Sequence, residues 1–316
     1  MAINPSNFTI VITTKNRRDD LAFTLRKICH LIESGVECII CDDGSSDDTA
    51  AFLQMEYPVI KLIQNKKSRG LILSRNRLLH MVTTEYAISL DDDAHFITEN
   101  PLESIIKHFE MNPTCGLIAL RIFWGLDSPA NIVSNEETLR VKGFVGCGHV
   151  WRMKAWQKIP NYPEWFVFYG EEDFASFQLF KKGWEVHYVP AILVNHRVDL
   201  KARKNDKEYQ LRLRRSLRSG WYLYILFYPW YEIPRRFAYT LWIQIKNKAF
   251  KGDWKATLAI MQAMGDLVIN LPRLLYHSNR LSAAEYNSYS KLSETKLYWK
   301  PEKIIKKLYL DINRKL

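Results

Sequence analysis

The sequence lacks the features that define several specialised classes of protein. Its five cysteines are an odd number, and its single CxxC spacing, Cys38 and Cys41, has no second cysteine pair or histidine pair beside it. Neither a disulfide framework nor a structural zinc motif is therefore indicated. We expect no signal peptide within residues 1–8 and no apolar segment long enough to span a membrane. These absences favour a cytoplasmic protein with reduced cysteines.

Internal repeats and low-complexity tracts are also missing, and the composition is that of a folded chain. Of the 316 residues, 47% are hydrophobic and 25% are charged, which allows one large core or a core with an appendage. The formal net charge is +11. A basic balance of this size favours a polyanionic partner, such as nucleic acid, anionic lipid or a phosphorylated substrate.

Short apolar segments alternate with segments of helical period over the first 90 residues. The pattern predicts strands at 8–13, 36–41, 59–63 and 86–90, with helices at 19–34, 49–55 and 71–81 between them. Such alternation predicts an α/β fold, a Rossmann-like and mostly parallel sheet flanked by helices. We expect a catalytic domain over 1–200 and a helical, basic and aromatic C-terminal extension over 201–316.

Two acidic clusters come directly after predicted strands. Asp42 and Asp43 follow one strand, and Asp91, Asp92 and Asp93 follow another. Ligands of parallel α/β sheets bind at the carboxyl ends of the strands, so both clusters should converge on one crevice. Adjacent carboxylates repel one another unless a cation or water neutralises them, and Mg²⁺ or Mn²⁺ suits such ligands. The alternatives are a solvated acidic loop and a helix-capping turn.

Further polar candidates lie in the second half of the expected domain. Glu171, Glu172 and Asp173 begin a helical pattern, where they are either partners of the helix dipole or a general base beside an aromatic wall. His196 follows an apolar segment and is either a metal ligand or a histidine at the edge of the core. The turn-like composition around Gly148 is typical of a close backbone approach to a substrate or of a plain turn.

Six of these segments, in this order, resemble the family 2 inverting glycosyltransferases of GT-A fold. They are TIVITTKNR (9–17), CDDGSSDDT (41–49), RGLILSRNRL (69–78), SLDDDA (89–94), YGEEDFASFQLFKKG (169–183) and VPAILVNH (189–196). The resemblance spans about residues 8–197. It implies a metal-dependent transfer of sugar from a nucleotide-diphosphate donor (UDP-, dTDP- or GDP-linked) to a glycan or lipid-linked acceptor, as in bacterial surface polysaccharide assembly.

The resemblance also implies roles for individual residues. Those placed at the nucleotide-sugar are Thr13, Arg17, Asp42, Asp43, Arg75, Asp91 and Asp92. Asp93 is implied as the direct metal ligand, with Asp91 and His196 completing the Mn²⁺ or Mg²⁺ site. Glu172 or Asp173 matches the family's catalytic base; counting back from Gly183 favours the first and the literal Glu-Asp pair favours the second. Residues assigned to the acceptor pocket are Gly148, His149, Trp165 and Glu171.

Two other functions and two interpretations of the C-terminal region stay open. The basic C-terminal region is compatible with nucleic-acid binding, and metal use with a nucleotidyltransferase, although residues 13–17 contain no glycine for a phosphate loop. Basic residues within 201–218 precede seven aromatic residues within 221–231. This order predicts either contact with an anionic membrane surface, at the inner face of the cytoplasmic membrane, or packing of the aromatics on the catalytic domain or in a homodimer.

Overall fold

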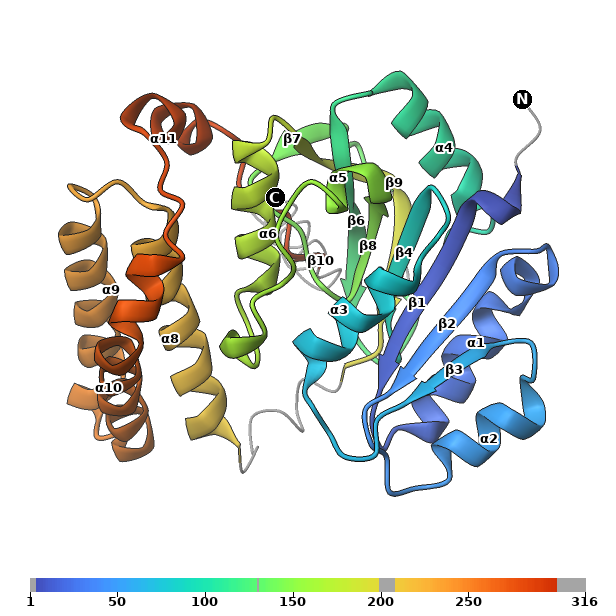
Figure 1. Ribbon diagram of the computed structural model, residues 1–316, viewed down its shortest axis with the longest axis horizontal. Coiled ribbons are helices and arrows are strands. Elements are labelled where there is room, and N and C mark those ends of the chain that lie inside the picture. Colours follow the sequence, from blue (N-terminus) through green and yellow to red (C-terminus); the bar gives the residue numbers. More distant parts are fainter. Residues whose placement is uncertain (1–3, 130, 199–207, 300–316) are drawn as a thin grey trace, which may run out of the picture.

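The computed structural model describes residues 4–129, 131–198 and 208–299, so the expected domain boundary near residue 200 lies outside the described residues. One ten-stranded sheet forms the centre, with the order β3-β2-β1-β4-β8-β6-β9-β5 (Figure 1). The strands of its first half are parallel: β1 (Phe8–Thr14), β2 (Glu37–Asp42), β3 (Lys61–Gln64) and β4 (Tyr86–Asp91). These are the four predicted strands, and the mostly parallel α/β sheet is confirmed.

The second half of the sheet is mixed. β8 (Gly148–Arg152) runs antiparallel to both β4 and β6 (Cys115–Trp124). β9 (Glu185–His196) is parallel to β6 and pairs with the short antiparallel strands β5 (Ala94–Phe96) and β7 (Leu139–Val141). β10 (Tyr298–Trp299) pairs with β6. The β5–β9 pairing brings the end of β9 back to the segment that follows β4.

Helices cover both faces of the sheet because successive side chains of each strand point to opposite sides. On β1, Ile10 and Ile12 pack under α1 (Arg18–Glu33), α2 (Thr49–Glu56) and α4 (Pro101–Met111). Val11 packs on the other face with α3 (Leu71–Met81), α5 (Met153–Trp156) and α6 (Glu171–Lys181). Short 3-10 turns η1 (Pro5–Asn7) and η2 (Glu164–Phe166) complete this part.

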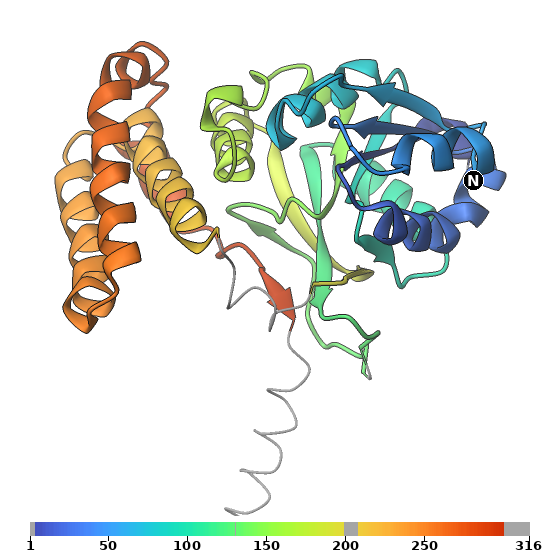
Figure 2. The ribbon, with the colours of Figure 1, turned by 90° about the horizontal axis from the view of Figure 1, so that it is seen from below.

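The C-terminal helices pack on the sheet domain through aromatic side chains. α8 (Tyr209–Phe227) lies nearest to α6, and α9 (Ile233–Asn247), η3 (Ala249–Lys251) and α10 (Trp254–Tyr276) lie beyond it (Figures 1 and 2). α11 (Ala283–Ser290) returns toward α6. Phe227 is fully buried, and its ring stacks on Phe177 of α6 at 4.8 Å.

The aromatic segment 221–231 therefore packs mainly on protein. Trp221 and Tyr222 are buried, whereas Trp230 and Tyr231 are exposed. Arg214 of the basic segment is also engaged internally, in an ion pair with Asp266 of α10. The basic residues at 201, 203, 204 and 207 lie outside the described residues.

The expectation that no apolar segment is long enough to span a membrane is wrong. α10 has 23 residues and is long and apolar enough to cross a membrane by length and composition, with only 22% of its most apolar window buried. The clearest feature of this segment in the sequence is its helical period, and the same period is typical of a helix in a protein core.

The Phe227 contact makes a testable prediction about stability. Phe227→Ala should lower the free energy of unfolding by about 3–5 kcal/mol, because it removes a fully buried ring at the junction of α6 and α8. Urea unfolding followed by circular dichroism measures this. The matched control is Tyr239→Ala on exposed α9, which should change stability by no more than about 0.5 kcal/mol. Equal effects of the two substitutions would contradict the packing.

Candidate functional site

The acidic triplet lies where β4 ends beside the end of β1. Asp91 is the last residue of β4 and pairs in register with Thr13 of β1. Asp92 and Asp93, in the following turn, are 5% and 3% exposed. The sequence thus buries two adjacent carboxylates and leaves a third half-buried, which requires compensating positive charge.

Arg17, at the start of α1, supplies part of that charge. Its Nη1 lies 3.0 Å from Asp92 Oδ1, and its Nη2 lies 2.7 Å from Asp93 Oδ2. Burial and the charges of Asp93 and Asp91 raise the pKa of Asp92 to about 8 despite this ion pair. For Asp93, burial opposes ionisation, but His196 and Arg17 prevail and lower the pKa to about 2. The positive charge of Arg17 alone therefore does not balance the negative charge of the acidic triplet.

Asp91, Asp93 and His196 form a candidate metal site. One ligand atom of each lies within 4.8 Å of the others, and His196 Nε2 is 3.0 Å from Asp93 Oδ1. The β5–β9 pairing delivers His196, which is in register with Ala94 directly after the triplet. Two carboxylates and an imidazole in a region of excess negative charge fit Mn²⁺ or Mg²⁺. The structure therefore brings together the three residues that the sequence assigned to the metal.

Arg75 of α3 joins the triplet to the second group of acids. Its buried guanidinium lies 2.6 Å from Asp91 Oδ1, 3.1 Å from Glu171 Oε1 and 3.1 Å from the carbonyl oxygen of Gly146. The neighbouring Asp91 and Glu171 raise the pKa of Arg75 in spite of burial, so it stays charged. Burial, followed by the charge of Glu172, raises the pKa of Glu171 to about 8.

Glu172 faces this same group, and Asp173 does not. A methyl group at Gly146 would lie 2.3 Å from Glu172 Oε1 and 2.9 Å from Arg75 Nη1, so the side chains of Glu172 and Arg75 both lie against Gly146. Burial raises the pKa of Glu172, with Arg75 opposing and Asp91 reinforcing the shift. Asp173 instead lines a separate cavity of about 400 Å³ between α6, α8 and α11.

Asp42 and Asp43 hold the loops beside the site. Asp42 Oδ1 accepts a hydrogen bond from the backbone N–H of Ser45. Asp43 accepts five hydrogen bonds, all from the loop and the first turn of α3: from Asn65, Ser68, Arg69, Gly70 and Ser74. These bonds lower the pKa of Asp43 although burial acts against them. The carboxylate that the resemblance placed at the nucleobase thus also positions the loop in front of α3.

The residues expected at the acceptor are not assembled into one surface. Gly148 and His149 lie within the central strand β8, where Gly148 faces Val194 and the ring of His149 lies 4.6 Å from Phe144. Trp165 contacts Tyr222 of α8 at 5.5 Å. Of these four residues, Glu171 is the one that forms an ion pair with a residue of the site, Arg75. The glycine-rich composition at 146–148 resembled an open loop, whereas the strand that follows it is central and buried.

Sequence reasoning missed two contributors. Thr14 Oγ1 donates to Asp92 Oδ2 at 2.9 Å, and the backbone N–H of Arg197 donates to the carbonyl oxygen of Asp93 at 2.9 Å. The Arg197 side chain also donates to Asp20 O and Thr24 Oγ1. In the sequence, Thr14 follows Thr13 and Arg197 follows His196, and this adjacency was the one feature that could have indicated them.

Comparisons with known proteins identify the family of this chain. The family model described as Glycosyl transferase family 2 matches residues 9–176. An uncharacterized glycosyltransferase of Haemophilus influenzae is 27% identical over 110 residues, and UDP-Glc:alpha-D-GlcNAc-diphosphoundecaprenol beta-1,3-glucosyltransferase WfaP of Escherichia coli is 30% identical over 91 residues. These matches cover 35% and 28% of this chain, and the chain spans only 37% and 36% of the lengths of those relatives.

A solved structure shares the fold. The crystal structure of GalNAc-T7 with UDP, GalNAc and Mn²⁺ superposes with a TM-score of 0.58 at 13% sequence identity. The match covers 84% of this chain and 57% of that chain.

The buried position of His149 predicts sensitivity to acid. Burial, followed by the charge of Arg75, lowers the pKa of His149 from 6.5 to about 3. The unfolded chain takes up a proton at this residue below about pH 6.5 and the folded chain does not, so the stability is present above pH 6.5 and is lost as the pH falls toward 3. One such group contributes a slope of up to about 1.4 kcal/mol per pH unit.

We expect His149→Leu to lose less stability than the parent between pH 7 and pH 4.5 in urea unfolding. His30→Leu, on the exposed side of α1, is the control and should keep the parent's slope. A His149→Leu protein with the parent's pH dependence would show that His149 is not held neutral.

Proposed function

Because the chain belongs to glycosyl transferase family 2 and has the GT-A fold, we propose that this glycosyltransferase is metal-dependent and inverting. It would move a sugar from a nucleotide-diphosphate donor to a hydroxyl of a glycan or lipid-linked acceptor, with residues 1–200 as the catalytic domain. The observation that carries this proposal is the position of Glu172, whose carboxylate lies against Gly146 beside Arg75, while Arg75 pairs with Asp91 of the metal set.

The donor would lie across the carboxyl ends of β1, β2 and β4. Asp91, Asp93 and His196 would hold Mn²⁺ or Mg²⁺, which supplies positive charge to the departing diphosphate. Thr13 and Arg17 lie at the end of β1 and the start of α1, at the edge where a nucleotide would enter. GalNAc-T7, which shares the fold, binds UDP and Mn²⁺, and this supports the donor class.

Glu172 is proposed as the general base. Its raised pKa makes it a stronger proton acceptor than an exposed glutamate, and its carboxylate lies against Gly146, beside Arg75 and on the side of the metal set. A single base that deprotonates the acceptor hydroxyl, with attack opposite the departing diphosphate, inverts the anomeric centre. Asp173, the other candidate, lines a different cavity, and this supports the choice of Glu172 as the base.

The acceptor is proposed to be lipid-linked. The name of the Escherichia coli relative specifies a GlcNAc-diphosphoundecaprenol acceptor. In this chain α9, η3 and α10 expose an apolar helical face, defined by Tyr239, Trp242, Phe250, Trp254, Met261, Met264, Val268, Ile269, Leu271, Leu275 and Tyr276. Phe250 and Ile269 are 71% and 77% exposed. An amphipathic helical surface of this kind binds at the boundary of headgroups and acyl chains.

Charge favours an anionic bilayer as the occupant of the apolar helical face. Residues 233–276 contain seven basic side chains, at 235, 236, 246, 248, 251, 255 and 273, against two acidic ones, Asp253 and Asp266. Asp266 is engaged by Arg214, and Asp253 caps α10. Each basic residue near an anionic surface contributes about 1 kcal/mol. We therefore propose that the enzyme works at the inner face of the cytoplasmic membrane.

The base assignment is tested with paired amide substitutions. Glu172→Gln should reduce turnover by roughly 10²–10⁴-fold, while Asp173→Asn should stay near the parent. Release of nucleotide from UDP-, GDP- and dTDP-sugars, with membrane-extracted lipid-linked glycans as acceptors, measures turnover. Glu172→Gln should also keep the Mn²⁺-dependent thermal shift with the donor, and Asp93→Ala should lose it. Severe loss in Asp173→Asn with mild loss in Glu172→Gln would reverse the assignment.

The membrane proposal is tested by co-sedimentation with phosphatidylglycerol-containing vesicles at low salt. The double substitution Val268→Ser and Ile269→Ser should weaken binding by tenfold or more, because two apolar side chains no longer enter the bilayer. Met55→Ser with Val59→Ser is the control, since both are exposed apolar residues at the opposite end of the molecule. Unchanged binding in the first variant overturns the proposal, and loss of a dimer in analytical ultracentrifugation would assign the face to a homodimer.

A further inference from the structure

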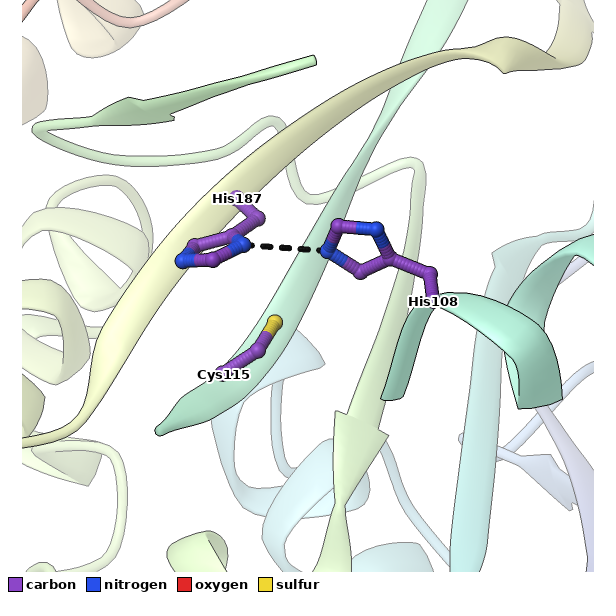
Figure 3. Close-up of side chains that lie close together, drawn as sticks. All are labelled: His108, Cys115 and His187. Carbon is purple, nitrogen blue, oxygen red and sulfur yellow. Dashed lines mark hydrogen bonds between the residues drawn. The ribbon is translucent and has the colours of Figure 1, made fainter. Parts of the chain in front are cut away.

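A cluster of two histidines and one cysteine lies at the end of the sheet opposite the acidic triplet. β6 and β9 are parallel to each other, and both begin at this end, at Cys115 and Glu185. His108 comes from the last turn of α4, and His187 from the start of β9. Figure 3 shows a nitrogen of each imidazole ring directed toward the other ring, with the thiol of Cys115 directed toward the space between them. The proposed transfer reaction uses none of these residues.

The ligand atoms of the cluster are spaced for a small cation. His108 Nε2 lies 3.0 Å from His187 Nδ1, and one ligand atom of each of the three residues lies within 4.8 Å of the others. Tetrahedral zinc, with bonds of about 2.0–2.1 Å to nitrogen and about 2.3 Å to sulfur, separates its ligands by roughly 3.3–3.6 Å. Small side-chain shifts therefore suffice to bring all three onto one ion.

The hydrogen bond behind His187 orients that histidine as a metal ligand. His187 Nε2 lies 2.8 Å from Glu185 Oε2, which places a proton on Nε2 and leaves Nδ1 free of a proton on the side of the cluster. Glu185 is itself held by Thr114 and Arg140. A carboxylate behind a ligating imidazole is the usual second partner in zinc sites. On the other side, the Asn112 amide donates to His108 Nδ1 at 3.4 Å, so the proton of a neutral His108 lies on Nε2 and must leave that atom when a metal binds.

The charge around the cluster also permits a divalent cation. Arg152 is a positive charge close enough to act on Cys115, and its guanidinium donates to the backbone carbonyl oxygens of Cys115 and Phe109 rather than to the ligand atoms. Cys115 is fully buried, and its thiol donates to Leu117 O at 3.4 Å, so the thiol must release its proton when a metal binds. The thiolate and Glu185 then contribute two negative charges.

We propose that His108, Cys115 and His187 form a second metal site, selective for Zn²⁺ or a similar thiophilic divalent cation, with solvent as the fourth ligand. A nitrogen and sulfur ligand set favours zinc over Mg²⁺, whereas the acidic set at the other end favours Mg²⁺ or Mn²⁺. The ion would tie the end of α4 to the first residues of β6 and β9. This site is independent of the proposed transfer reaction.

The test uses Co²⁺ as a spectroscopic probe on the full chain. After chelation, one equivalent of Co²⁺ is added with excess Mg²⁺ to occupy the acidic site. A near-ultraviolet charge-transfer band from thiolate to cobalt should appear in the parent and in Cys29→Ser, whose cysteine is far from any histidine pair. It should be absent in Cys115→Ser, while Asp93→Ala should keep it. No band in the folded parent, or a band retained in Cys115→Ser, would overturn the proposal.

A second variant keeps the test decisive if Cys115→Ser does not fold. Glu185→Gln leaves the three ligands in place and should weaken zinc binding by about 10–100-fold, because it removes the carboxylate behind His187. Competition with a zinc chelator measures this affinity, and native mass spectrometry should report one zinc per parent chain. Unchanged affinity in Glu185→Gln, or no retained zinc in the parent, would count against the site.

Discussion

The burial of carboxylates at the end of β4 is the constraint on which the site depends. Asp91, Asp92 and Asp93 are joined by Glu171 and Glu172, and the paired cations are Arg17 and Arg75. Five carboxylates facing two guanidinium groups leave an excess of negative charge even with Asp92 and Glu171 protonated part of the time. A diphosphate would be repelled from such a crevice unless a metal cation accompanied it. On this electrostatic argument, the diphosphate of a donor would bind together with a metal cation. His196 lies where it could bind that cation.

The sheet topology places these groups from distant parts of the chain. Parallel strands β1, β2 and β4 align their carboxyl ends, which brings together Thr13, Asp42 and Asp91. The antiparallel β8 then returns the chain across the sheet, so that Gly146 lies against Arg75 and the start of α6. The side chain at residue 146 must be absent because Glu172 and Arg75 already fill that space. The crossover to β9 and its pairing with β5 deliver His196 from more than 100 residues later in the chain.

Local patterns predicted the first half of the fold and the convergence of the acidic strand ends, because strand and helix periods and acidic strand ends are local features, whereas His196 entered the proposed metal set only through the family resemblance. Sequence spacing could not decide whether Glu172 or Asp173 faces the site. Adjacent helical residues point about 100° apart, and tertiary packing sets the direction of α6. His149 was misplaced because a glycine-rich segment precedes a central strand. The aromatic residues at 221–228 were ambiguous for a similar reason: burial against α6 or against lipid requires the same composition.

The distribution of charge on the protein favours a membrane over nucleic acid as its partner. Phosphate backbones require a basic groove with polar readout, whereas the crevice of this protein is acidic. The excess basic residues of the C-terminal helices accompany exposed Trp, Met, Val and Ile side chains on α9, η3 and α10, a combination that matches a headgroup and acyl boundary. Because α8 packs on α6 through Phe227 and Phe177, and on α10 through Trp221, the helix α6 that carries Glu172 in its first turn is joined through α8 to the helices of the apolar helical face. A membrane bound at that face would therefore fix the proposed base, Glu172, at a set distance from the lipid surface, where the proposed lipid-linked hydroxyl would be presented.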